Sequence, residues 1–240
     1  RALVAYDGTD YHGFQILSDK QSVQGALEQA LQRLTGQSTR IRYAGRTDAG
    51  VHAEGQVIAA SVVWRHSLAD LERAWNARLP LDIAVRELAE VDDARFHPRF
   101  SARSRVYRYT VWTAPVRSPL QRRYTHHQPK RLDVERMNQA AAMLVGSHDF
   151  SSFGQPTQGE STVREVLRAG WQASGSLLIF EIEANAFLRR MVRTIVGTLL
   201  DVGAGRRSVE NVSQVLAAQD RAQAASPAPA CGLCLVEVKY

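Results

Sequence analysis

The fold of this chain is decided by residues 41–64, which read IRYAGRTDAGVHAEGQVIAASVVW. The alternation at 41–44 predicts a short strand, and the apolar run at 57–64 predicts a longer one. The polar loop between them is bounded by Gly45 and Gly50, residues that permit backbone conformations and close approaches that other residues resist. Asp48 is therefore expected on a tight connection at a strand end, where side chains can be presented to a ligand.

The segments on either side of this loop alternate between strands and helices. Ser22 and Ser67 are suited to cap helices, because a serine side chain can accept a hydrogen bond from the first turn. The first half is predicted to contain a strand at 3–6, a helix at 22–34, the two strands above, a helix at 67–79 and a strand at 83–91. This order is the split βαβ arrangement of ferredoxin-like folds, a frequent scaffold for RNA binding.

The second half repeats this order. The predicted elements are strands at 106–112, 161–171, 177–184 and 233–238, and helices at 133–145, 187–202 and 209–217. A polar, basic stretch at 95–103 marks the boundary. We predict an α/β (α+β) protein of two ferredoxin-like halves, 1–100 with the Asp48 loop and 101–240 completing the site. Together they are expected to form a mixed, mainly antiparallel sheet with a central basic cleft.

Composition limits the class of protein. The chain has 240 residues, of which 45% are hydrophobic and 22% charged, so it is globular rather than disordered. Its formal net charge of +6 favours polyanionic partners. No apolar run approaches the roughly 20 residues that a membrane-spanning helix needs. The two cysteines, in Cys231-Gly232-Leu233-Cys234, are expected on a strand without a redox or zinc role, and reduced cysteines suit the cytosol.

Two groups of residues could carry chemistry in the first part of the chain and at its centre. Arg46 could hold the Asp48 carboxylate ionised or bind a phosphate beside it, which makes Asp48 a candidate nucleophile or base. The alternative is that Asp48 only caps a turn. On the strand near 106–112, Tyr107 and Tyr109 share one face and Arg108 the other. That pattern suits base stacking with phosphate contacts, or equally a half-buried core strand.

Two further groups are basic. Arg189 and Arg193 are four residues apart on the predicted helix 187–202, where they could bind an anion near its N-terminus or form an ordinary solvated face. The loop after the strand near 106–112 could offer phosphates a surface of cationic residues. These are Arg117, Arg122, Arg123, His126, His127, Lys130 and Arg131. The histidines show no metal-binding spacing, so no metal is expected.

Seven segments follow one another in order along the chain: Tyr6-Asp7-Gly8-Thr9 with Tyr11-His12-Gly13-Phe14-Gln15, Ser22-Val23-Gln24-Gly25, Gly45 to His52, Phe100-Ser101-Ala102 with Tyr107-Arg108-Tyr109, Gly146 to Phe153, Phe187 to Arg193, and Gly232 to Val236. In these segments the chain resembles, over nearly its whole length, the TruA-type tRNA pseudouridine synthases. The resemblance implies a cytoplasmic homodimer without metal or organic cofactor. It would isomerise uridine to pseudouridine at positions 38, 39 and 40 in the anticodon arm of tRNA.

The resemblance also implies roles for individual residues. Asp48 would be the nucleophile, attacking either C6 of the base or C1′ of the sugar, and Arg193 would pair with it and keep it ionised. Tyr107 would stack on the flipped uridine, and a part in proton transfer at C5 stays open. Arg46 would help to flip the base or occupy its place, and would bind backbone phosphate. Leu235 would line the base pocket.

The chain also departs from the family pattern. Ile16 and Leu17 stand where the family usually has an arginine, which puts one phosphate contact in doubt. Arg189 and Arg190 replace histidines of some relatives, so Arg189 is expected to affect RNA binding. Two alternatives stay open: a catalytically silent tRNA-binding protein, and an Asp-dependent hydrolase of phosphate esters that needs a divalent metal.

Overall fold

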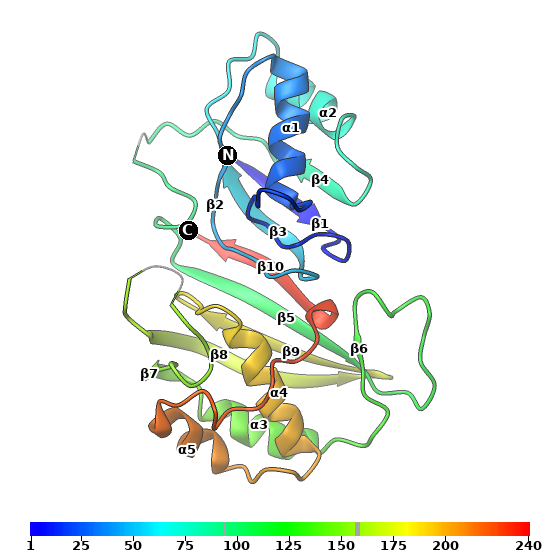
Figure 1. Cartoon of the computed structure of the whole chain (residues 1–240), viewed down its shortest axis with the longest axis vertical. Helices are drawn as coiled ribbons and strands as arrows, with labels where there is room; N and C mark the ends of the chain where they lie inside the picture. Colours follow the sequence, from blue (N-terminus) through cyan, green and yellow to red (C-terminus); the bar gives the residue numbers. More distant parts are fainter. Residues whose placement is uncertain (94, 157–158) are drawn as a thin grey trace. The chain divides into compact units, whose positions relative to one another are not determined.

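The computed structural model describes residues 1–93, 95–156 and 159–240. These form two compact units (Figure 1). Unit 1 comprises Arg1–Arg103 and Cys234–Tyr240, and unit 2 comprises Ser104–Leu233. Both units combine helices with strands that pair mainly antiparallel, which confirms the α/β (α+β) class.

Unit 1 has the strand order of a ferredoxin-like fold. Its elements are β1 (Ala2–Tyr6), α1 (Val23–Thr35), β2 (Arg42–Tyr43), β3 (His52–Ala59), α2 (Leu68–Asn76), β4 (Ile83–Arg86) and most of β10 (Leu233–Lys239). β1 is antiparallel to both β4 and β3. On the other edge of β3, β2 pairs antiparallel at Ile58 and β10 pairs parallel at His52. The predicted order of strands and helices is therefore confirmed in this unit.

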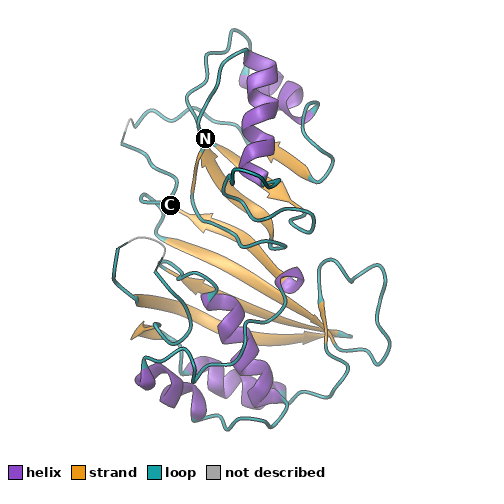
Figure 2. Ribbon diagram, in the orientation of Figure 1, coloured by secondary structure: helices purple, strands orange, loops and turns teal. Residues whose placement is uncertain are grey.

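Local sequence signals explain the two helices of unit 1. The Ser22 hydroxyl accepts a hydrogen bond from the Gly25 N–H at 3.2 Å, and Gly36 ends α1 at a φ of 73°. Ser67 caps α2 in the same way as Ser22 caps α1. The two helices lie beside the sheet (Figure 2) and contact each other, where the Trp75 Nε1–H donates to the Leu27 carbonyl at 3.3 Å.

Unit 2 is a sheet in the order β5-β9-β8-β7, with helices packed on it. Its elements are β5 (Ser104–Trp112), β6 (His126–His127), α3 (Val134–Ala142), β7 (Gly146–Asp149), β8 (Val163–Ser174), β9 (Leu177–Ala184), α4 (Met191–Gly203), α5 (Asn211–Ala218) and the 3₁₀ turn η1 (Ala230–Gly232). β5 to β9, β9 to β8 and β8 to β7 are all antiparallel. α3 packs against both β8 and α4.

Several predicted boundaries are wrong, and three of the differences have a local reason. β3 begins at His52 rather than 57 because the residues after the Asp48 loop pair at once with β1. β4 ends at Arg86 because Glu87 takes a φ of 55°. α4 begins at Met191 rather than 187 because Arg190 takes a φ of 64°, outside the helical region.

Two strands were not predicted, and Cys231 lies in a different element from the one expected. The two-residue strand β6 and the strand β7 were not predicted, since neither has a clear alternation. Cys231 lies in η1 rather than on a strand, and burial raises the pKa of its thiol. Residues 234–240, expected in the second half, count with unit 1, where β10 pairs with β3.

Candidate active-site loop and its basic partners

The loop that carries Asp48 is clamped at its start by a buried amide. Gln56, on β3, is fully buried. The Gly45 N–H donates to Gln56 Oε1 at 3.2 Å, and Gln56 Nε2 donates to the Gly45 carbonyl at 2.7 Å. One side chain therefore satisfies both backbone groups of Gly45 and fixes where the loop leaves β2.

Thr47 anchors the middle of the loop. Its hydroxyl is hydrogen-bonded to the Tyr6 hydroxyl at 2.8 Å, and its carbonyl accepts from the Phe14 N–H at 3.2 Å. Further on, the Val51 N–H donates to the Asp48 carbonyl and closes a turn. Gly50 has a φ of 77°, as its predicted turn role requires, whereas Gly45 is not in the left-handed region. The backbone on both sides of Asp48 is thus held in place.

Two glycines let the segment after β1 approach this loop closely. A Cβ at Gly8 would lie 2.0 Å from the Val51 carbonyl oxygen, and a Cβ at Gly13 would lie 2.6 Å from that of Thr47. The Gly8 N–H also donates to Nδ1 of the buried His52 at 3.0 Å. Residues 8–13 therefore form a wall against the Asp48 loop that a larger side chain would push away.

The side chains of the loop differ in exposure. Asp48 is half-buried, while Arg46 is exposed and its Nε lies 3.4 Å from the Tyr43 hydroxyl. A half-buried carboxylate on a fixed backbone suits nucleophilic attack, since little motion is needed to present it.

Leu235 is in register with residues of β3 and β1 that lie close to this loop. It pairs with Ala53 of β3, and Ala53 pairs on its other edge with Tyr6. Residues directly opposite each other in a sheet point to the same face. Leu235 therefore lies on the face of Tyr6, whose hydroxyl contacts Thr47.

In unit 2, β5 alternates as predicted. Tyr107 is 8% exposed and packs edge-on against Phe187 with ring centroids 5.0 Å apart, and Tyr109 is fully buried. Arg108 is paired with Glu181 (Nε to Oε1, 3.3 Å). Arg105 donates to the Asn185 carbonyl at 2.7 Å. The arginines of this strand thus bind protein acceptors, and phosphate contacts from them stay a prediction.

Arg193 lies in the first turn of α4 and is held by the segment that precedes η1. Its Nε donates to the Ala228 carbonyl at 2.7 Å, and its own carbonyl accepts from the Ala228 N–H at 2.9 Å. The next residue, Pro229, accepts a hydrogen bond at 2.9 Å from the Tyr109 hydroxyl. Burial raises the pKa of Tyr109, so its hydroxyl stays protonated and remains a donor.

Arg189 does not lie on a helix, which corrects the prediction that it shares a helical face with Arg193. Its N–H donates to the Gln155 carbonyl at 2.8 Å, and its side chain is exposed. Of the predicted site residues, Arg46, Asp48 and Leu235 thus lie in unit 1, and Tyr107, Arg189 and Arg193 lie in unit 2.

Five residues shape these sites in ways that were not predicted. Gln56, Gly13 and Tyr6 hold the Asp48 loop, and Tyr109 and Ala228 hold the surroundings of Arg193. Tyr6, Gly13 and Tyr109 lie in the ordered motifs, but no sequence signal marked Gln56 or Ala228, because their partners lie far away along the chain.

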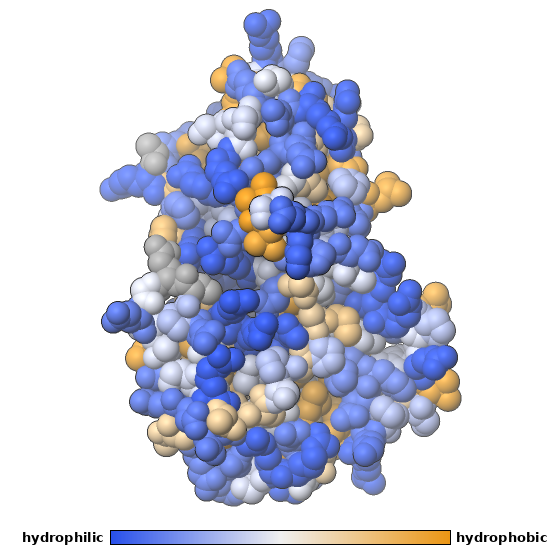
Figure 3. Space-filling model, viewed as in Figure 1, coloured by the Kyte–Doolittle hydropathy of each residue, from blue (hydrophilic) through white to orange (hydrophobic). Residues whose placement is uncertain are grey.

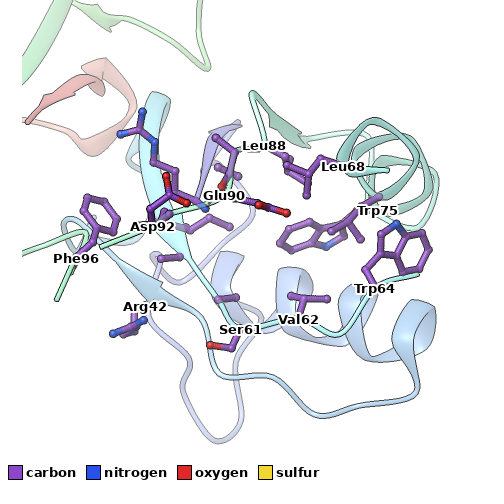
Figure 4. A pocket seen from close by; sticks show the side chains of 18 of the residues that line it. Arg42, Ser61, Val62, Trp64, Leu68, Trp75, Leu88, Glu90, Asp92 and Phe96 are labelled. Carbon is purple, nitrogen blue, oxygen red and sulfur yellow. Dashed lines mark hydrogen bonds between the residues drawn. The ribbon is translucent and has the colours of Figure 1, made fainter. Parts of the chain in front are cut away.

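A groove of about 710 Å³ opens in unit 1 at the end of β3 that is farther from Asp48 (Figure 4). It is lined by Trp64, Leu68 and Trp75 on one side and by Glu90 and Asp92 on the other. None of the predicted site residues lines it.

Among the residues that the structure describes, no three or more His, Cys, Asp or Glu side chains are grouped so as to hold a metal ion. No described helix is long and apolar enough to cross a membrane.

Known proteins resemble this chain over its full length. The profile of a family described as "tRNA pseudouridine synthase" matches residues 2–101 and 140–240. A protein named tRNA pseudouridine synthase A from Geobacillus kaustophilus is 46% identical over 242 residues, which cover 100% of this chain and 93% of the relative. Proteins of the same name from Halalkalibacterium halodurans and Chloroflexus aurantiacus are 45% and 47% identical, covering 96% and 99% of this chain and 88% and 87% of the relatives.

Proposed function

We propose, because this chain belongs to the tRNA pseudouridine synthase family, that it acts on uridines 38, 39 and 40 in the anticodon arm of tRNA. The chain is an enzyme that isomerises uridine to pseudouridine in tRNA, as its family does. We further propose that Asp48 is the nucleophile of this reaction.

The reaction rearranges bonds without changing composition. The bond between N1 of uracil and C1′ of ribose breaks, the base turns, and a bond forms between C5 and C1′. C5 loses its proton and N1 gains one, so no oxidant or reductant is consumed. The base must leave its stack before a carboxylate can reach it, whether the attack falls on C6 or on C1′.

The rigid Asp48 loop is the observation that carries the proposal. Gln56, Tyr6 and Phe14 fix the backbone on the N-terminal side of Asp48, and the turn closed by Val51 fixes the other side. A nucleophile held in this way needs little reorganisation to attack. We assign to Arg193 the role of pairing with Asp48 and keeping it ionised, since a neighbouring guanidinium favours the charged carboxylate.

The remaining predicted residues are assigned to substrate binding. Tyr107 would stack on the flipped uridine, and Leu235 would line the base pocket. Arg46, which is exposed, would bind backbone phosphate and help to flip the base. Arg189, also exposed, would contribute to RNA affinity.

Tritium release from 5-tritiated uridine in unmodified tRNA tests the proposal. We expect release by the wild-type enzyme in the presence of a chelator, and none by Asp48→Asn, although both bind tRNA. Asp220→Asn is the control, because its exposed carboxylate accepts from the Ala222 N–H and from no other described residue. Release by Asp48→Asn at the wild-type rate would refute the nucleophile. Mapping of pseudouridine in the product RNA tests positions 38, 39 and 40.

The resemblance also leads us to propose that the enzyme works as a homodimer in the cytoplasm. Sedimentation equilibrium at micromolar concentration should give twice the mass of the chain. A monomer mass at this concentration, with full activity, would contradict the dimer.

A further inference from the structure

Residues 113–131, here called the basic arm, concentrate the positive charge of the chain. The arm contains five cationic residues and no Asp or Glu: Arg117, Arg122, Arg123, Lys130 and Arg131. The formal net charge of the whole chain is +6, so removing these five charges would leave the other residues at +1. The excess charge of the protein is therefore a property of this one segment.

The base of the arm is built into the sheet of unit 2. β6, inside the arm, pairs parallel with the end of β5, His126 opposite Val111. The Gln128 N–H donates to the Trp112 carbonyl at 2.8 Å, and the Trp112 Nε1–H donates to the Val116 carbonyl at 2.9 Å. Both ends of the arm are thus attached to β5.

The outer part of the arm is folded on itself. The Tyr124 N–H donates to the Gln121 carbonyl at 3.0 Å, and the Thr125 hydroxyl donates to the same oxygen at 2.9 Å. The Cys231 thiol donates to the Thr125 carbonyl at 3.4 Å. A surface that is ordered beforehand loses less conformational entropy when it binds a partner.

Some arginines of unit 2 are neutralised by carboxylates, while others, such as Arg189 and Arg190, form no ion pair with a described residue. Arg108 and Arg168 are paired with Glu181, and Arg206 and Arg207 are paired with Asp201. By contrast, four cations of the arm form no ion pair with any residue that the structure describes: Arg117, Arg122, Lys130 and Arg131. An ordinary solvated face would mix both signs of charge, so this arrangement points to an external anion.

The side chains at the tip are exposed as well. Val116 is 76% exposed, Leu120 88% and Tyr124 49%. Figure 3 shows the arm as a mainly hydrophilic projection with hydrophobic atoms at its edge. Exposed aromatic and cationic side chains together suit single-stranded or looped RNA, where bases can stack on the ring while phosphates meet the cations.

We propose that the basic arm binds the phosphate backbone of tRNA at nucleotides other than the one being isomerised. This inference rests on the proposed function, in which Tyr107 stacks on the target base. Tyr107 is five residues before the base of the arm at Trp112, and a strand rises about 3.3 Å per residue, so the arm begins roughly 17 Å away along β5. At that distance the cations meet phosphates of neighbouring parts of the RNA.

Salt-dependent filter binding of unmodified tRNA to the Arg117→Gln/Arg122→Gln double variant tests this inference. Each lost phosphate contact should lower the slope of log K against log salt by about 0.7–0.9, so we expect a slope shallower by about 1.5. Affinity should fall roughly tenfold at 0.1 M salt. The control is Arg65→Gln/Arg78→Gln, which removes two exposed arginines that have no ion pair among the described residues, and it should bind as the wild type does.

An unchanged slope in the Arg117→Gln/Arg122→Gln variant, or the same loss in the control variant, would overturn the inference. A changed sedimentation mass with an unchanged slope would indicate a protein partner at the arm and would also overturn it. The assay measures binding alone, so its result is independent of whether Asp48→Asn abolishes tritium release. Failure of the arm and failure of the nucleophile are thereby distinguished.

Discussion

Individual hydrogen bonds between residues distant along the chain hold the Asp48 loop and the surroundings of Arg193 in place. Thr47 is fixed by Tyr6, 41 residues earlier, and the segment that holds Arg193 is fixed by Tyr109, 120 residues before its acceptor Pro229. Each bond contributes about 1 kcal/mol to stability. Their larger effect is on position, because an error of about 1 Å at a reacting group can reduce a rate about a hundredfold.

Tyr109→Phe tests whether this positioning matters for catalysis. The substitution keeps the ring but removes the hydroxyl that donates to the Pro229 carbonyl. Pro229 is then no longer held by this bond, and neither is the adjacent Ala228, whose carbonyl binds Arg193. We expect kcat in steady-state tritium release to fall about tenfold, with KM for tRNA unchanged. Tyr240→Phe is the matched control, since its hydroxyl also donates to a proline carbonyl, that of Pro98 at 2.8 Å. Equal kcat values for the two variants would argue against a positioning role.

The same tyrosine should affect stability at high pH. Burial raises the pKa of Tyr109 in the folded state above the value near 10 of the unfolded chain. Above pH 10 the unfolded chain therefore binds fewer protons than the native state, and the free energy of unfolding falls as pH rises. In Tyr109→Phe the fall between pH 10 and 11 should be smaller by about 1 kcal/mol, as measured by urea unfolding. Parallel curves for both proteins would contradict it.

At the scale of elements, the end of β1 and the start of β3 are built around one contact. Gly8 follows β1, and its backbone lies against Val51 just before β3 begins. The strand order alone does not require this approach. It arises because the Asp48 loop folds back onto the segment after β1, where the Gly50 N–H donates to the Tyr11 carbonyl and the Thr47 carbonyl accepts from the Phe14 N–H.

Gly8→Ala should separate these two elements. The new Cβ would lie 2.0 Å from the Val51 carbonyl oxygen, so the backbone must shift. We expect the free energy of unfolding to fall by about 1–3 kcal/mol. We also expect the rate of tritium release to fall by more than the fraction of enzyme that this loss of stability unfolds. Gly170→Ala is the control, because its Cβ would meet only Asn138 Oδ1 at an ordinary 3.7 Å. Wild-type activity in Gly8→Ala would show that the approach is not needed.

At the scale of the whole molecule, unit 1 is completed by the last seven residues of the chain. β10 pairs with β3 next to His52, Tyr240 donates to the Pro98 carbonyl, and its ring contacts that of Phe96. Deletion of Cys234–Tyr240 should therefore expose the amides of β3 to hydrogen exchange while those of β8 and β9 in unit 2 stay protected. Equal loss of protection in both units would contradict this division.

The sequence by itself determined most of the helices and strands and the activity. Alternation predicted β5 and β9, serines predicted the starts of α1 and α2, and ordered motifs indicated the family, because these signals act within a few residues of each other. Only the tertiary structure decided that Gln56 clamps Gly45, that Gly8 must be small and that Ala228 holds Arg193. Such contacts join residues distant along the chain, and the packing of elements sets their geometry, which no local pattern records.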